Sequence, residues 1–267
     1  MTPLRTTPSL LVAKGISKRF GGIHALSDVD FTINRGEIYG LIGPNGAGKT
    51  SLFNVLTGIY SADGGTFEFD GEPLNGLKPN QVAARGIART FQNIRLFQNL
   101  SALENVMIGR HVRTHAGVFG AIFRNRATLA EERAIEKRAY ELLDYVGVAK
   151  HANSLARHLA YGDQRRLEIA RAMATDPKLL ALDEPAAGMN ATETQDLKRL
   201  LEDIRRDGTT ILLIEHDMKL VMSICDRVLV LDYGKKIAEG SASDVQRDPK
   251  VIAAYLGGEV TLNLRRA

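Results

Sequence analysis

The stretch of residues 43–51, which reads Gly-Pro-Asn-Gly-Ala-Gly-Lys-Thr-Ser, constrains the fold and the chemistry of this chain more than any other. It fits the P-loop pattern, in which two glycines separated by four residues are followed by Lys and then by Ser or Thr. Residues 38–42 before it have the composition of a short buried strand, and residues 51–56 after it carry the apolar spacing of a helix. A strand, a glycine-rich loop and a helix in this order form the context that the pattern requires, which disfavours a chance glycine-rich turn.

The loop residues predict a binding site for a nucleoside triphosphate and Mg²⁺. Gly43, Gly46 and Gly48 permit positive φ angles, so successive backbone N–H groups can turn inward around an anion. The helix that follows points the positive end of its dipole at the same place. Lys49 reaches the β- and γ-phosphates, and the Thr50 hydroxyl is a ligand for Mg²⁺. The expected nucleotide-binding residues of this loop are Gly43, Pro44, Asn45, Gly46, Ala47, Gly48, Lys49, Thr50 and Ser51.

Composition narrows the class of protein. Of the 267 residues, 44% are hydrophobic and 25% are charged, which is typical of a soluble globular protein with a large core. The net charge of +4 suits a polyanionic ligand or an anionic membrane surface and does not choose between them. Cys225 is the single cysteine, which excludes an internal disulfide, fits a reducing cytosol and predicts a place in the core for this residue.

No targeting or membrane-spanning segment is expected. The N-terminal stretch lacks the apolar segment of a secretory signal, and no apolar run approaches the roughly 18 residues of a membrane span. The sequence therefore predicts a soluble, cytoplasmic protein, unless a partner holds it at a membrane.

Strands alternate with helices along the chain, which predicts an α/β fold whose mainly parallel sheet binds ligands at its carboxyl edge. Ser101 and Glu104 are spaced as in a capping box at the start of a helix, and Asp248, Pro249 and Gly257 bracket another. The expected strands are residues 10–20, 25–33, 38–42, 66–71, 87–92, 179–182, 210–214, 227–232 and 235–238. The expected helices are residues 51–56, a helix from 101, residues 128–146, a helix that includes 197–204 and ends at 208, and a helix from 249.

Two carboxylates follow one of these apolar strands. Residues 179–182 read Leu-Leu-Ala-Leu and precede Asp183 and Glu184, as in a Walker B motif. Asp183 is placed to hold Mg²⁺ through water, and Glu184 to orient or deprotonate the attacking water. An acidic loop after a strand is common in itself, but its position downstream of a P-loop favours the functional interpretation.

Residues 159–172 lie between these motifs and read Leu-Ala-Tyr-Gly-Asp-Gln-Arg-Arg-Leu-Glu-Ile-Ala-Arg-Ala. They resemble the signature motif of ATP-binding cassette (ABC) proteins, whose commonest form is LSGGQ. Gln92 stands at the Q-loop position and His216 at the H-loop position, so every marker occurs in the expected order between about Val12 and Gly257. The sequence contains neither the guanine-reading motif of GTPases nor the HRD and DFG motifs of kinases.

One subgroup of the family is especially similar, namely the ATPase subunits of branched-chain amino-acid importers. Residues 111–127 are basic and contain glycine, and we expect an insertion or a long connection there. The longer segment 111–146 resembles the larger of the two ATPase subunits of such importers. Further similar stretches are Phe20-Gly21-Gly22, Thr90-Phe91-Gln92-Asn93, Asp183-Glu184-Pro185-Ala186-Ala187-Gly188, Glu215-His216-Asp217-Met218 and Ala254-Tyr255-Leu256-Gly257.

The resemblance implies a P-loop NTPase (RecA-like) α/β core with a mainly parallel sheet, an N-terminal antiparallel β subdomain and an α-helical signature subdomain. The ATP-binding domain would span residues 10–257, with its core in 10–92 and 175–240 and its helical subdomain in about 93–174. Residues 241–267 would form a C-terminal helix and tail specific to the importer subgroup.

The resemblance also implies roles for the site residues. Two cassettes would enclose two ATP molecules, and Gly162 and the helix N-terminus at Gln164 would offer backbone donors to the γ-phosphate of the opposite subunit. His216 would hold the γ-phosphate, and Gln92 would sense it and couple to the membrane subunits. The implied catalytic residues are Glu184, His216 and Gln92, the implied Mg²⁺ ligands are Thr50, Gln92 and Asp183, and the implied signature residues are Leu159, Ala160, Tyr161, Gly162 and Asp163.

The sequence allows two structural roles for each of two aromatic residues, Phe20 and Phe97. Phe20, just before a turn, is either an ordinary core residue or a platform on which adenine stacks. Residues 95–97, Arg-Leu-Phe, either line a groove for a helix of a membrane subunit or form a plain loop with a buried Phe97. Departures from the common motifs of the family are Ala160, Tyr161, Asp163 and Asn190.

The implied function is that of an ATP-hydrolysing, energy-coupling subunit of an importer for branched-chain or related amino acids. Its partners would be two membrane permease subunits, a second ATP-binding subunit and, indirectly, a solute-binding protein, with no nucleic acid. It would lie peripherally at the cytoplasmic face of the inner membrane. Importers of urea or amides and exporters of lipid or lipopolysaccharide stay open as alternatives. A soluble ABC ATPase of translation or DNA repair fits less well, because this chain has one P-loop and a single cysteine.

Overall fold

The computed structural model describes residues 8–110 and 126–255, with side chains for 8–110 and 129–255. The expected insertion at 111–127 lies almost wholly outside these ranges. The chain divides into two compact units, one of residues up to Val82 and from Thr194 onward, the other from Ala83 to Glu193. The chain passes from one unit to the other within α2 (Pro79–Arg85) and near the start of α7 (Ala191–Arg206).

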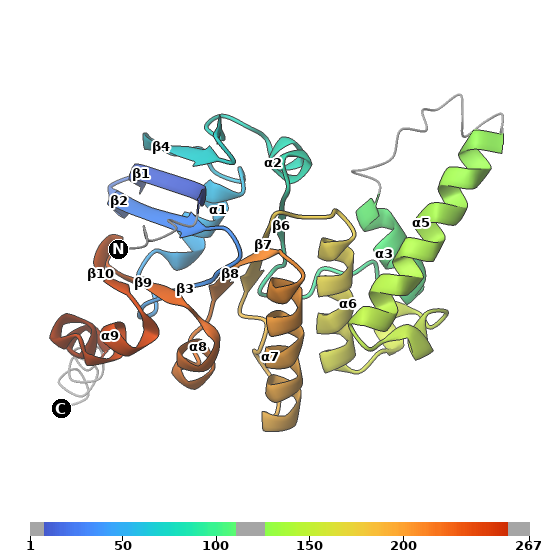
Figure 1. Ribbon diagram of the computed structural model, residues 1–267. Helices are drawn as coiled ribbons and strands as arrows, with labels where there is room; N and C mark the ends of the chain where they lie inside the picture. Colours follow the sequence, from blue (N-terminus) through green and yellow to red (C-terminus); the bar gives the residue numbers. More distant parts are fainter. Residues whose placement is uncertain (1–7, 111–125, 256–267) are drawn as a thin grey trace, which may run out of the picture. The chain divides into compact units, whose positions relative to one another are not determined.

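The first unit contains an antiparallel sheet with the strand order β2-β1-β4-β5. Its strands are β1 (Ser9–Phe20), β2 (Ile23–Asn34), β4 (Gly64–Phe69) and β5 (Glu72–Pro73). β1 and β2 form a hairpin in which Phe20 pairs with Ile23 across two glycines. Figure 1 shows β1, β2 and β4 side by side. The apolar residues of β2, namely Leu26, Val29, Phe31 and Ile33, are all buried.

The same unit contains a set of strands around β3 (Ile38–Ile42). β3 pairs in parallel with β8 (Thr210–Ile214) and with β9 (Arg227–Asp232), and β9 pairs antiparallel with β10 (Lys235–Gly240). Every residue of β3 and β8 is buried, which explains why both strands are continuous apolar runs instead of alternating ones. Besides most of α7, this unit contains the helices α1 (Lys49–Leu56), α8 (Met218–Ile224), α9 (Ala242–Arg247) and a helix over 249–255.

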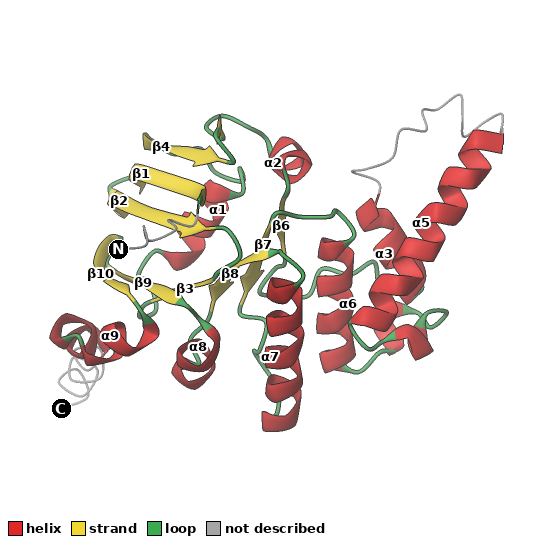
Figure 2. Cartoon of the chain, viewed as in Figure 1, coloured by secondary structure: helices red, strands yellow, loops and turns green. Residues whose placement is uncertain are grey.

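The second unit pairs β6 (Ile87–Arg89) in parallel with β7 (Leu179–Asp183) and contains a group of three helices. These helices are α3 (Ala102–Arg110), α5 (Arg126–Tyr145) and α6 (Tyr161–Met173), and they pack against one another. The expected capping box begins α3, since the Glu104 N–H donates to Ser101 Oγ at 3.1 Å and the Ser101 N–H donates to Glu104 Oε2 at 2.7 Å. Short 3₁₀ turns at Ala149–His151 and Ala156–His158 connect α5 to α6. Figure 2 colours the helices of this unit red and its strands yellow.

Several features differ from the sequence expectation. β6 ends at Arg89 and not at residue 92, and the carbonyl oxygens of Phe91 and Gln92 beyond it accept from Arg165, a residue distant in sequence. The signature helix begins at Tyr161 and not at Gln164, whose N–H already donates to the Ala160 carbonyl at 2.9 Å. The short helices α2 and α9 were not expected, although Ser241 is an N-cap of α9.

In the described part of the chain, no helix combines the length and the apolar character that crossing a membrane requires.

Candidate functional site

The P-loop follows β3 directly and depends on two close backbone contacts. Gly43 and Gly48 have φ angles of 152° and 102°. A Cβ on Gly43 would lie 2.2 Å from the carbonyl oxygen of Leu231, and a Cβ on Gly48 would lie 2.6 Å from that of Ala25. Only glycine fits at these two positions, so the loop lies tightly between β9 and β2.

Lys49 begins α1 and turns back over the loop. Its Nζ donates to the carbonyl oxygens of Gly43 at 2.7 Å and Pro44 at 3.0 Å, and the residue is buried. In the described structure, no side chain caps the N-terminus of α1 at Gly48. The first turn of α1, which includes Thr50, therefore presents backbone N–H groups beside an ammonium group, a set of donors that fits phosphate.

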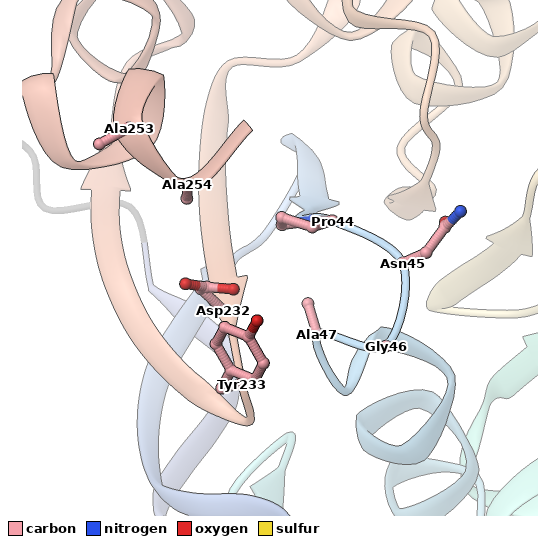
Figure 3. Close-up of a pocket in the computed structure, with 8 residues that line it drawn as sticks. All are labelled: Pro44, Asn45, Gly46, Ala47, Asp232, Tyr233, Ala253 and Ala254. Carbon is pink, nitrogen blue, oxygen red and sulfur yellow. The ribbon is translucent and has the colours of Figure 1, made fainter. Parts of the chain in front are cut away.

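A hollow of about 310 Å³ lies beside the loop. Figure 3 shows its walls, which are formed by Pro44 to Ala47 of the loop, Asp232 at the end of β9, Tyr233 in the turn to β10, and Ala253 and Ala254 of the helix over 249–255. Tyr255 follows, and its buried hydroxyl lies near the backbone of Gly43 in the loop. Burial raises the pKa of Tyr255. The C-terminal helix thus lies next to the phosphate-binding loop, which the sequence pattern did not reveal.

Phe20 lies at the end of β1 and is not a core residue. Its side chain is 41% exposed, so the core interpretation is wrong. The ring packs edge-on against Tyr60 at 5.1 Å between centroids, and Lys18 Nζ lies 5.5 Å from its centroid. An aromatic ring with this exposure offers apolar surface on which a flat ligand can pack.

Asp183 and Glu184 end β7 in different environments. Asp183 is buried, and its N–H donates to Thr90 Oγ1 at 3.3 Å. Glu184 has a φ of 48°, a left-handed conformation that costs energy for a residue with a side chain. Backbone strain of this kind gathers at functional sites, and here it falls on the expected catalytic base.

The structure brings Gln92 and Glu184 together. Gln92 Nε2 donates to Glu184 Oε2 at 2.9 Å, although the two residues are 92 positions apart. The sequence placed both residues in the site but gave no sign of this contact. The hydrogen bond connects the Q-loop to the Walker B carboxylate within one unit.

The signature turn packs against the loop that follows Walker B. A Cβ on Gly188 would lie 3.3 Å from Tyr161 Cε1, and a Cβ on Gly162 would lie 3.0 Å from Glu193 Oε1. Glu193 Oε2 accepts from the Asn190 N–H at 2.9 Å. Tyr161, which replaces a glycine of the common motif, therefore fills the space beside Gly188.

The remaining signature residues differ in exposure. Leu159 is buried, whereas Ala160 is exposed as the N-cap residue of α6. The Asp163 carboxylate, in the first turn of α6, lies 3.5 Å from His151 Nε2.

His216 has an exposed side chain in the first unit, the unit that also contains the P-loop and Phe20. Its backbone N–H donates to Glu215 Oε2 at 3.2 Å. The next residue, Asp217, is the N-cap of α8, so the position of His216 is tied to the start of that helix. The other predicted catalytic residues, Gln92 and Glu184, belong to the second unit.

The loop after β6 exposes an aromatic surface with positive charge. Phe97 is 49% exposed, so the interpretation with a buried Phe97 is wrong. The guanidinium groups of Arg89 and Arg95 both lie over the Phe91 ring, at 4.5 and 4.4 Å from its centroid. Burial lowers the pKa of Arg89 to about 10. Sequence reasoning singled out Arg95 only as part of residues 95–97 and did not single out Arg89, because nothing in the spacing of the two arginines shows that both lie over one ring.

Sequence comparison assigns the family. Residues 26–187 match the family described as ABC transporter. The chain belongs to this family. Residues 235–261 also match a family described as branched-chain amino acid ATP-binding cassette transporter. Membership makes the chain an ATPase that drives membrane transport.

Curated relatives cover nearly the whole of this ABC protein. The high-affinity branched-chain amino acid transport ATP-binding protein LivG of Salmonella typhimurium is 46% identical over 93% of this chain and 98% of its own length. The corresponding protein BraF of Pseudomonas aeruginosa is 45% identical with the same coverage. The lipopolysaccharide export system ATP-binding protein LptB of Escherichia coli is 34% identical over 94% of this chain and 99% of its own length.

Solved structures show the same fold. An ATP-binding cassette of an ABC transporter in its ADP conformation has a TM-score of 0.82 and 32% identity, covering 94% of this chain and 100% of its own. A dimeric bacterial ABC transporter cassette has a TM-score of 0.75 and 26% identity, covering 87% of this chain and 99% of its own. The expected α/β P-loop NTPase fold is therefore confirmed.

Proposed function

We propose that this ABC ATPase energises the import of branched-chain or related amino acids. Support comes from the relatives named for branched-chain amino acid transport, which match over 93% of the chain, and from the C-terminal match at residues 235–261. The lower identity of 34% to the lipopolysaccharide export protein makes export the weaker alternative. An importer of urea or amides would use the same ATPase chemistry. The two kinds of importer differ in which solute, when loaded on the binding protein, stimulates ATP turnover.

Lys49, Thr50 and the backbone amides of residues 43–51 would bind the phosphates of ATP, with Mg²⁺ as cofactor. The Lys49 ammonium already lies over the loop, within hydrogen-bond distance of two carbonyl oxygens. Thr50, Asp183 and Gln92 would hold Mg²⁺, since they offer oxygen atoms of the kind that it prefers, and the cation would supply positive charge to offset that of the phosphates. The exposed ring of Phe20 would stack on adenine.

Glu184 would act as the general base that orients and deprotonates the attacking water. Its carboxylate accepts a hydrogen bond from Gln92 at 2.9 Å, and its backbone is held in a strained conformation. Gln92 would thereby position the base and report on the γ-phosphate. His216, whose side chain is exposed, would donate to the γ-phosphate.

The ATPase would work as a pair of cassettes, because the signature residues 159–163 would serve ATP bound to the opposite subunit. The similarity to a dimeric bacterial cassette supports pairing. The second cassette would be a related ATP-binding subunit, and two permease subunits would hold the pair at the cytoplasmic face of the membrane. The exposed Phe97, with Arg95 nearby in the chain, would contact a permease helix.

The experiment is purification of the tagged chain from its own cells in mild detergent. The proposal predicts that two permeases and a second ATP-binding subunit copurify. It also predicts that a binding protein loaded with leucine, isoleucine or valine raises ATP turnover several-fold, whereas one loaded with urea does not. Copurification with lipopolysaccharide-binding subunits, or stimulation by urea alone, would refute the proposed solute.

A further inference from the structure

Two buried charges on the signature helix take no part in the roles assigned above. Arg165 and Glu168 lie one turn apart on α6, with only 2% and 1% of their surfaces exposed. Arg165 Nη1 lies 3.4 Å from Glu168 Oε2. Burying a pair of charges is costly unless further hydrogen bonds satisfy both groups, so the partners of this pair indicate what it holds in place.

Arg165 holds the backbone of the Q-loop. Its Nη1 donates to the Phe91 carbonyl oxygen at 2.8 Å, and its Nη2 donates to the Gln92 carbonyl oxygen. The same Nη2 donates to the Tyr161 hydroxyl at 3.0 Å. One guanidinium group therefore joins the Q-loop to the first residue of the signature helix.

Glu168 and Arg171 hold the next part of the same loop. Glu168 Oε1 accepts from the Arg95 N–H at 3.3 Å, and Arg171 Nη1 donates to the Arg95 carbonyl oxygen at 2.5 Å. Burial raises the pKa of Glu168. Residues 91–95 are thus held at both ends by side chains of α6, and all of these contacts lie within the second unit.

The contacts continue to functional residues on either side. Gln92 donates through its side chain to Glu184, the proposed base. At the other end, the Tyr161 ring lies against Gly188, in the loop after Walker B. A chain of contacts therefore runs from Glu184 through Gln92, Arg165 and Tyr161 to Gly188.

We infer that Arg165 is a positioning residue that makes the Q-loop and the signature turn move as one piece. A change in the positions of Glu184 and Gln92, in the cassette's own site, then moves the signature residues that would contact ATP bound to the partner cassette. This inference rests on the proposed pairing of two cassettes. Arg165 can act in this way because its planar, fork-shaped donor set reaches two carbonyl oxygens and a hydroxyl at once.

Arg165→Lys tests this role in the purified transporter complex, because lysine keeps the charge but cannot span the three acceptors. The expected result is a fall of about tenfold in kcat, the size expected for lost hydrogen bonds to a charged group. ATP affinity, measured with a fluorescent nucleotide, should change less than about twofold, since no atom of Arg165 is assigned to the nucleotide. Arg199→Lys on α7, where the arginine is exposed and contacts Asp196, is the matched control and should leave both quantities unchanged.

Tyr161→Phe separates coupling from simple packing. It keeps the ring against Gly188 and removes only the hydroxyl that accepts from Arg165. If the two residues act through one contact, the double variant should be no slower than Arg165→Lys alone. Effects that multiply would show that Arg165 and Tyr161 act independently and would overturn the inference.

Two further results would also overturn it: an unchanged kcat in Arg165→Lys, or a parallel loss of kcat and ATP affinity with a lower Tm, which indicates a structural role alone. The proposed function is tested separately by the wild-type complex. Lack of a second cassette or of amino-acid stimulation there refutes the pairing or the solute before any variant is made.

Discussion

At the scale of single residues, backbone geometry explains several identities in the site. Position 43 requires glycine, because a Cβ there would lie only 2.2 Å from the Leu231 carbonyl oxygen. Glu184 has a left-handed backbone despite its side chain, with φ 48°, and this geometry occurs where the carboxylate meets Gln92. A substitution at either position therefore changes more than the side chain itself.

Lys49→Ala should lower ATP affinity by roughly 100-fold or more, because the variant loses the cation that faces the β- and γ-phosphates. Equilibrium binding of a fluorescent ATP analogue measures the effect. Lys219→Ala, on the exposed side of α8, is the control and should bind as the wild type does. Wild-type affinity in Lys49→Ala would contradict the role assigned to the P-loop.

Cys225 should be almost unreactive in the folded protein. Burial raises the pKa of its thiol to about 12, so the reactive thiolate is scarce at pH 8. Relative to a free thiol of pKa about 8.5, alkylation should be slower by roughly 1,000-fold. The rate with iodoacetamide is compared before and after unfolding in guanidinium chloride. Equal rates would show that the thiol is not buried.

At the scale of helices and strands, the sequence predicted the elements whose position depends on the residues of the element itself. The continuous apolar runs of β3, β7 and β8 occur where the sequence placed them, since burial on both faces leaves a clear signal. The conformation of the chain after β6 was not predictable, because the Gln92 carbonyl oxygen accepts from Arg165, 73 positions further along the chain. The motifs identified the candidate residues Gln92 and Glu184, but only the fold shows that they are in contact.

The helix after His216 depends on one cap. Asp217 Oδ1 accepts from the N–H groups of Lys219 at 2.8 Å and Leu220 at 3.3 Å. Asp217→Ala should cost about 1 kcal/mol and lower Tm by roughly 2–4 °C, because these donors at the start of α8 lose their partner. Asp217→Asn keeps an acceptor and should retain most of the stability. Calorimetry compares the variants, and equal Tm values for Ala and Asn would contradict the capping role.

At the scale of the whole molecule, the functional residues are divided between two units. The P-loop, Phe20 and His216 belong to one, and Gln92, Asp183, Glu184 and the signature turn belong to the other. We propose that ATP binding brings two cassettes together, and that this pairing couples ATP binding and hydrolysis to transport. Hydrolysis at Glu184 would end the paired state, so blocking hydrolysis should preserve it.

Glu184→Gln separates ATP binding and pairing from hydrolysis. The amide keeps the size of the side chain and an acceptor for Gln92, but it cannot take a proton from water, so turnover should fall by about 10²–10⁴. Purified variant incubated with ATP and Mg²⁺ should contain bound, unhydrolysed ATP and elute at the larger hydrodynamic size of a pair of cassettes. Glu184→Gln combined with Lys49→Ala should lose both the nucleotide and the size shift. Wild-type turnover in Glu184→Gln, with no change in size, would contradict the account.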